Sequence, residues 1–215
     1  MTTKELAIIE RNLLPHLPGF AIKGREMFVP PVKHTLRGIH FDPSAFDKKS
    51  FSVSVFVMPL FVPSEHLTLN FADRVRHSGS ADRWNIGMPD LYFELSNALK
   101  QKAVPFLSSM ESLHRFIGAA QQILKEPGES RAFKNPHTLQ AIAYAFACIG
   151  EFQKSRDALD QLRQHLNLKV PWQRIMNERA ETLGNELRDD PGGAQRRLES
   201  WEAETIKNLG LEAFR

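Results

Sequence analysis

The chain has 215 residues, of which 42% are hydrophobic and 25% are charged, a balance that is typical of a folded globular protein. The formal net charge is +3, and the cations are spread along the chain without the basic stretch that is usual in nucleic-acid-binding proteins, so no nucleic-acid partner is expected. A single cysteine excludes an intramolecular disulfide framework, the longest apolar run is too short for a membrane span, and charges interrupt the N-terminal segment, so we expect a cytoplasmic protein without a membrane partner.

The N-terminal part predicts one helix followed by an antiparallel sheet. Thr2 or Thr3 is a typical N-cap for a helix whose apolar residues recur at helical spacing. Two short apolar runs on either side of Gly24 indicate a hairpin over residues 20–29, and Thr35–Phe41 predicts a third strand. The connections are too short for helical crossovers, so four or five strands should pair antiparallel.

The stretch Ser50–Phe71 is the best candidate for the centre of this sheet. Its apolar residues first alternate with serines from Phe51 onward, a period of two that is typical of a strand. Phe56 and Met58 then make the second side apolar as well, so this strand should become buried on both faces. A second alternating run at residues 67–71 predicts the next strand.

Residues 89–215 show the hydrophobic period of helices, which predicts a helical part that is either separate or packed with the sheet as one domain. Helices are expected at 90–99, 111–125, 137–149, 152–166 and 171–188, with a last helix after a break at Asp189–Gly193. The predicted fold class is therefore α+β, with residues 1–88 forming the helix and sheet and residues 89–215 forming the helical region.

The helix pair over residues 139–166 resembles the tetratricopeptide (TPR) repeat. The family's pattern is matched by Leu139, Ile142-Ala143, Phe146 and Gly150-Glu151-Phe152, whereas Ser155 and Leu162 stand where the family has alanine. No second copy follows, so the resemblance implies one TPR-like hairpin and not a solenoid. Because such hairpins line protein-binding grooves, it also implies partner-binding residues on the outward face of the first helix, for example Gln140 and Tyr144.

A second resemblance covers residues 19–71. Gly19-Phe20, Lys23-Gly24-Arg25 and Phe28, followed by the strand Phe51–Val57, resemble an uncharacterised bacterial family of helix-plus-sheet domains. Members of that family are linked to toxin immunity and defence, so the resemblance implies a bacterial protein with a role of this kind. Its motifs are structural, and no catalytic residue is carried over.

The densest charged stretch follows the predicted sheet, within residues 73–83. Arginine binds carboxylates and phosphates through a planar fork of donors. We therefore expect the cations of this stretch to contact an anionic ligand or an acidic protein surface: Arg74, Arg76, His77 and Arg83. The alternative is a solvated loop with local ion pairs.

No motif for phosphate binding, dinucleotide binding, zinc-protease or serine-hydrolase chemistry occurs in the sequence. His34, His40, Asp42 and Asp47 lie close together in the sequence, but a metal needs three or four converging ligands, so neither a metal nor another cofactor is expected. Cys148 lies in an apolar helix face and should be a buried structural thiol. The tryptophans fit amphipathic positions and should pack in the core or between domains, with binding platforms as the alternative: Trp84, Trp172 and Trp201.

The leading hypothesis is a non-enzymatic protein-binding protein of the bacterial cytoplasm, with an immunity or accessory role as its specific form. The alternative is a small hydrolase or ligand-binding enzyme with a polar cleft between sheet and helices. That enzyme would use His40, Asp42, Arg76 or His77, and it requires these side chains to converge within hydrogen-bond reach. Nucleic-acid binding is the third option, and it would show as affinity that falls steeply with salt.

Overall fold

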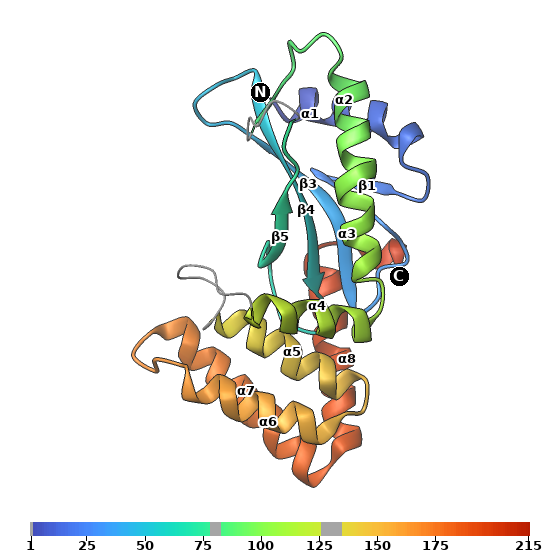
Figure 1. The fold of residues 1–215 in the computed structure, drawn as a ribbon. Coiled ribbons are helices and arrows are strands. Elements are labelled where there is room, and N and C mark those ends of the chain that lie inside the picture. Colours follow the sequence, from blue (N-terminus) through green and yellow to red (C-terminus); the bar gives the residue numbers. More distant parts are fainter. Residues whose placement is uncertain (1, 78–82, 126–134) are drawn as a thin grey trace. The chain divides into compact units, whose positions relative to one another are not determined.

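The computed structural model describes residues 2–77, 83–125 and 135–215 (Figure 1). The chain divides into two compact units, and neither is one continuous segment. The sheet unit consists of Met1–Met58, Leu69–Glu111 and Ala213–Arg215. The helical unit consists of Pro59–Thr68 and Ser112–Glu212.

The sheet unit begins with the predicted N-terminal helix, α1 (Thr3–Leu13), which continues into a short 3-10 turn, η1 (Leu14–His16). The Thr2 hydroxyl accepts a hydrogen bond from the Glu5 backbone N–H, and the Glu5 carboxylate accepts one from the Thr2 backbone N–H. This reciprocal capping box satisfies two backbone donors that a helix N-terminus otherwise leaves open. The prediction of a helix capped by a threonine is therefore confirmed.

An antiparallel sheet follows, which confirms the predicted α+β fold class. Its strands are β1 (Ala21–Lys23), β2 (Glu26–Phe28), β3 (Thr35–Pro43), β4 (Ser50–Pro59), β5 (Phe71–Arg74) and β6 (Trp84–Asn85). They are ordered β1-β2-β3-β4-β5, and β6 also pairs with β4. Gly24, at a φ of +65°, makes the turn of the predicted hairpin between β1 and β2.

Strand β4 is the centre of the sheet, as predicted, and all of its residues are buried. The strand predicted at residues 67–71 is misplaced, because pairing with β4 begins only at Phe71 and continues to Arg74. In the register of this pair Leu69 would stand opposite Pro59, which has no N–H to donate. The ladder therefore stops there, and Leu69 remains exposed.

Three helical segments follow β6 within the sheet unit: α2 (Leu91–Ala98), a π-helical turn η2 (Leu99–Ala103) and α3 (Val104–Ser109). Leu95 and Leu99 are completely buried, and the Arg37 guanidinium of β3 donates to the Leu107 carbonyl of α3. These helices thus belong to the sheet unit, whereas the sequence predicted a domain boundary between residues 88 and 89. A short final helix, η3 (Glu212–Phe214), brings the Phe214 ring edge-on to Phe28 at 4.9 Å.

The helical unit contains α4 (Leu113–Lys125), α5 (Pro136–Cys148), α6 (Phe152–Gln164), α7 (Pro171–Asp189) and α8 (Pro191–Asn208). Each helix packs on the next, and α8 also packs on α5. The predicted break at Asp189–Gly193 is shorter than expected, because Pro191, Gly192 and Gly193 already form the first turn of α8. The Asp190 carboxylate accepts from the Gly193 N–H at 2.9 Å, and proline is favourable at the first helical position.

The predicted hairpin is formed by α5 and α6, with Gly150 at a φ of +81° in the connection. The Ser155 hydroxyl donates to the Ala143 carbonyl across the pair at 2.7 Å. A residue at which the sequence departs from the TPR pattern therefore joins the two helices. Within the described parts of the chain, no helix has the length and apolar character that crossing a membrane requires.

Candidate functional site

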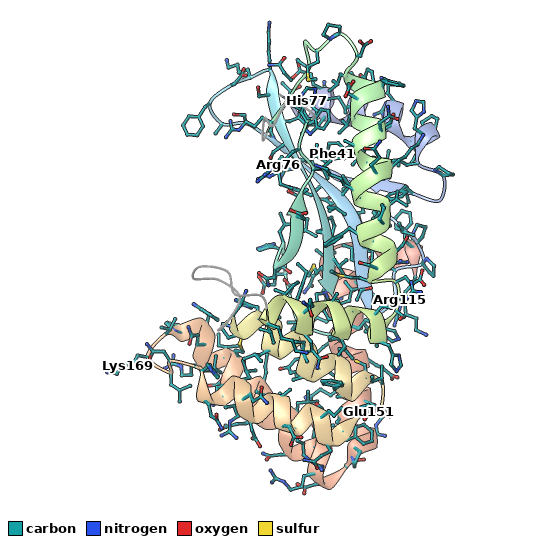
Figure 2. The ribbon with its side chains drawn as sticks, in the orientation of Figure 1. Phe41, Arg76, His77, Arg115, Glu151 and Lys169 are labelled. Atoms are coloured by element: carbon teal, nitrogen blue, oxygen red, sulfur yellow. The ribbon has the colours of Figure 1, made fainter. Side chains whose placement is uncertain are left out.

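The cations predicted to bind an anionic partner lie in the sheet unit. Some of them are exposed, and others contact the core or another loop. Residues 78–82 of this stretch are outside the described residues. Arg74 and Arg76 are exposed, whereas the His77 ring meets the buried Trp84 ring edge-on at 5.3 Å (Figure 2). The Arg83 guanidinium donates to the Ser44 hydroxyl in the loop between β3 and β4. Arg83 is thus hydrogen-bonded to another loop, whereas His77 packs on a core residue.

One residue named for an enzyme site, His40, is paired with a residue that the sequence did not suggest, Glu26. His40 Nδ1 lies 3.1 Å from the Glu26 carboxylate, directly across the strand pair β2–β3. Glu10 of α1, which interacts electrostatically with Glu26, has no exposed surface, and neither of its carboxylate oxygens has a hydrogen-bond partner. Burial, reinforced by the negative charge of Glu26, raises the pKa of Glu10 to about 7. Asp42 is exposed on β3. In the described part of the chain, no three His, Cys, Asp or Glu side chains come together as a metal site.

Gln140 and Tyr144, expected to line an open groove on α5, are both buried. The Gln140 amide donates to the Tyr144 hydroxyl at 3.2 Å, and the Tyr144 ring stacks on Trp201 of α8 at 5.5 Å. Burial also raises the pKa of Tyr144 to about 12. The expectation of a groove on this face is therefore corrected, because both residues are buried and Trp201 of α8 covers the Tyr144 ring.

An exposed apolar surface occurs instead where α6 connects to α7. Leu168, Trp172 and Ile175, which we call the Trp172 patch, are 53%, 44% and 49% exposed. Trp172 and Ile175 are three residues apart and so lie on neighbouring positions of one helix surface. The expectation that all three tryptophans pack in the interior is wrong for Trp172.

The local structure holds the Trp172 patch in place. The Trp172 ring stacks on His137, at the start of α5, with the ring centres 5.0 Å apart and the planes 12° apart. Burial lowers the pKa of His137, so the stacked imidazole is neutral at neutral pH. The Asn167 side chain accepts from the Lys169 N–H, and the Gln173 side chain accepts from the Asn167 N–H. Figure 2 shows Lys169 at the tip of this turn.

The sequence contains a signal for this patch in the spacing of α7. The buried stripe of the helix is formed by Met176, Ala180, Leu183 and Leu187. Ile175 precedes Met176 by one residue, which places it about 100° away around a helix of 3.6 residues per turn. Ile175 therefore lies away from the buried stripe of α7, and its side chain is exposed.

The comparisons with known proteins give no relative for this chain: no family model, no curated protein and no solved structure matches it. The two sequence resemblances, to the TPR repeat and to the bacterial helix-plus-sheet family, therefore stay predictions.

Proposed function

We propose that this chain is a non-enzymatic protein-binding protein that contacts its partner through the Trp172 patch. The observation that carries the proposal is the exposure of three large apolar side chains at one site: Leu168, Trp172 and Ile175. Contiguous apolar surface on a folded protein is typical of interaction sites, and tryptophan is enriched among the residues that dominate binding energy.

The fixed geometry of the patch favours binding. Trp172 is already stacked on His137, and the preceding turn is hydrogen-bonded through Asn167 and Gln173. A side chain that is ordered before binding loses less conformational entropy when the complex forms. Exposed Lys169 and Arg174 lie beside the apolar residues in the sequence. The matching partner is therefore a protein surface with an apolar centre and acidic groups at its edge.

The setting of this activity rests on the sequence alone. The resemblance of residues 19–71 supports an immunity or accessory role in the bacterial cytoplasm. The hairpin α5–α6 supports a binding role, since TPR-like helix pairs form binding surfaces in other proteins.

The test compares affinity capture by the wild-type chain and by a Trp172→Ala/Ile175→Lys variant, with bound proteins quantified by mass spectrometry. A matched control, Asn185→Lys, places the same charge at an exposed position of α7 outside the patch. We expect a partner that the wild type and the control recover and the double variant loses. The affinity of the double variant for the purified partner should be about 30-fold or more lower than that of the wild type, as is usual when a dominant interface residue is removed. Equal recovery by all three folded proteins, or no specific partner, would contradict the proposal.

A further inference from the structure

The loop between β3 and β4, Ser44–Lys49, contains a solvent-exposed phenylalanine, Phe46. The Phe46 side chain is 92% exposed. The Ser44 hydroxyl accepts from the backbone N–H groups of Phe46 and Asp47, at 3.2 and 3.1 Å, and it also accepts from Arg83. The Asp47 carboxylate accepts from the Lys49 N–H and from the Ser50 hydroxyl. The loop is therefore tied together by its own side chains while its aromatic ring remains uncovered.

The same unit contains an apolar groove between α1 and the segment that leads from β6 into α2. Its volume is about 220 Å³. Ile9 and Leu91 are buried at this site, while Ile8 and Tyr92 are partly exposed. The remaining lining residues are Glu5, Ile86, Met88 and Pro89. An apolar cavity of about 150 Å³ is known to hold benzene, so this groove has room for a phenylalanine ring.

The charges of the two features are complementary. Phe46 is followed by Asp47 and then by Lys48 and Lys49, all of them exposed, so the two lysines outweigh the one carboxylate of the loop. Glu5 lines the groove, and its hydrogen bonds to Thr2 lower the pKa of its carboxyl group, which keeps it ionised at neutral pH. A phenylalanine in a loop with an excess of positive charge thus fits an apolar groove with a carboxylate at its edge.

We propose that the chain self-associates, with Phe46 of one copy seated in the groove lined by Ile8, Met88 and Tyr92 of a second copy. Each copy carries both the loop and the groove, so a two-fold dimer makes the contact twice. The Ile86 N–H donates to the Lys49 carbonyl at 2.9 Å, so the loop and the groove are neighbours on the sheet unit. This closeness allows both contacts to lie in one interface, which favours a closed dimer over an open chain of copies.

The proposal is tested by sedimentation equilibrium over a wide range of protein concentrations. The wild type is expected to form dimers. Phe46→Ala removes the inserted ring from both contacts, and Ile8→Arg blocks both grooves. Each should raise the dissociation constant by about a hundredfold or more, since two interface anchors are lost together. The control Phe93→Ala removes an exposed phenylalanine ring of α2 that does not line the groove, and it should dimerise like the wild type.

A mixture of the two variants gives the decisive result. The Phe46→Ala chain keeps its groove and the Ile8→Arg chain keeps its ring, so a heterodimer regains one contact that neither homodimer has. We expect the mixture to associate more strongly than either variant alone. A wild type that stays monomeric at every concentration, a dimer that Phe46→Ala leaves intact, or a mixture without recovery would each overturn the proposal. The Trp172→Ala/Ile175→Lys variant should still dimerise, which separates this proposal from partner binding at the Trp172 patch.

Discussion

Glu10 should make the stability of α1 depend on pH near neutrality. The carboxyl group is fully buried without a hydrogen-bond partner, one turn from Leu6 on the apolar face of the helix. Burial raises its pKa from the ordinary value of 4.5 to about 7, and the negative charge of Glu26 adds to this effect. Arg25 and Arg11 oppose it. Glu10 is therefore protonated in the folded chain at a pH where the unfolded chain has released the proton.

The sign and size of the effect follow from this difference. The protonated group contributes its full stabilisation below the unfolded pKa, and the contribution is lost as pH rises through the folded pKa of about 7. The difference between the folded pKa of Glu10 and its ordinary value corresponds to at most about 3 kcal/mol of unfolding free energy. Local relaxation and penetration of water around the charged carboxylate should reduce this to about 1–2 kcal/mol.

The assay is amide hydrogen exchange of α1 at about pH 5.5 and about pH 8.5, corrected for the intrinsic exchange rates. A change of pH also acts on the rest of the chain, so the wild type alone cannot isolate the contribution of Glu10. Glu10→Gln removes the titration while it keeps the shape of the side chain. We expect the wild type to lose about 1–2 kcal/mol more protection than Glu10→Gln between the two pH values. An exposed-carboxyl control, Glu65→Gln, should behave like the wild type. Equal pH dependence of the wild type and Glu10→Gln would show that the Glu10 carboxyl group does not control the stability of α1.

Two further predictions concern the interiors of the units. Gly38→Ala should lower the unfolding free energy by about 2–3 kcal/mol in a denaturant titration, because the new methyl group would lie 2.7 Å from the Met27 carbonyl and 3.0 Å from the Phe56 ring. The control Gly118→Ala meets no atom within 4 Å on α4 and should be neutral or stabilising, so equal losses for both would contradict the packing argument. Cys148 is half-buried, where the sequence predicted a buried thiol. This burial and the charges of Glu202 and Glu199 raise its pKa to about 12, so alkylation by iodoacetamide at neutral pH should be at least about a hundredfold slower in the folded chain than in the unfolded chain. Rapid alkylation of the folded chain would show that the thiol is accessible.

The sequence predicts the elements whose signals are local. The alternation from Phe51 onward places β4, and the threonine before α1 together with Gly24 places the first helix and hairpin. The assignment of α2 and α3 to the sheet unit depends on tertiary contacts such as that of Arg37 with Leu107, which no local pattern encodes. The strand predicted at residues 67–71 failed for a related reason, since its pairing depends on the register against Pro59.

The candidate site was harder to predict than the fold. Gln140 and Tyr144 occupy positions that are open in an isolated hairpin, and they are buried because α4 and α8 also pack on α5. Glu10 follows Leu6 at helical spacing and precedes Leu13 by three residues, so the stripe already contained a carboxylate at an apolar position. Exposure of Phe46 depends on the hydrogen bonds of its loop, which involve Arg83 from a distant part of the chain.

The contact of Phe214 with Phe28 has a consequence for how the protein folds during synthesis. The Phe214 carbonyl also accepts from the Val32 N–H at 2.7 Å, so the last described segment is joined to the sheet unit by both a ring contact and a backbone hydrogen bond. These residues leave the ribosome only after the whole helical unit has been made. The sheet unit can form its strands early, but its final packing must wait, and closing so long a loop is slow compared with forming local contacts. In the interval the Phe28 ring lacks this cover, and that part of the sheet unit is where a nascent chain of this protein should be most open to a chaperone.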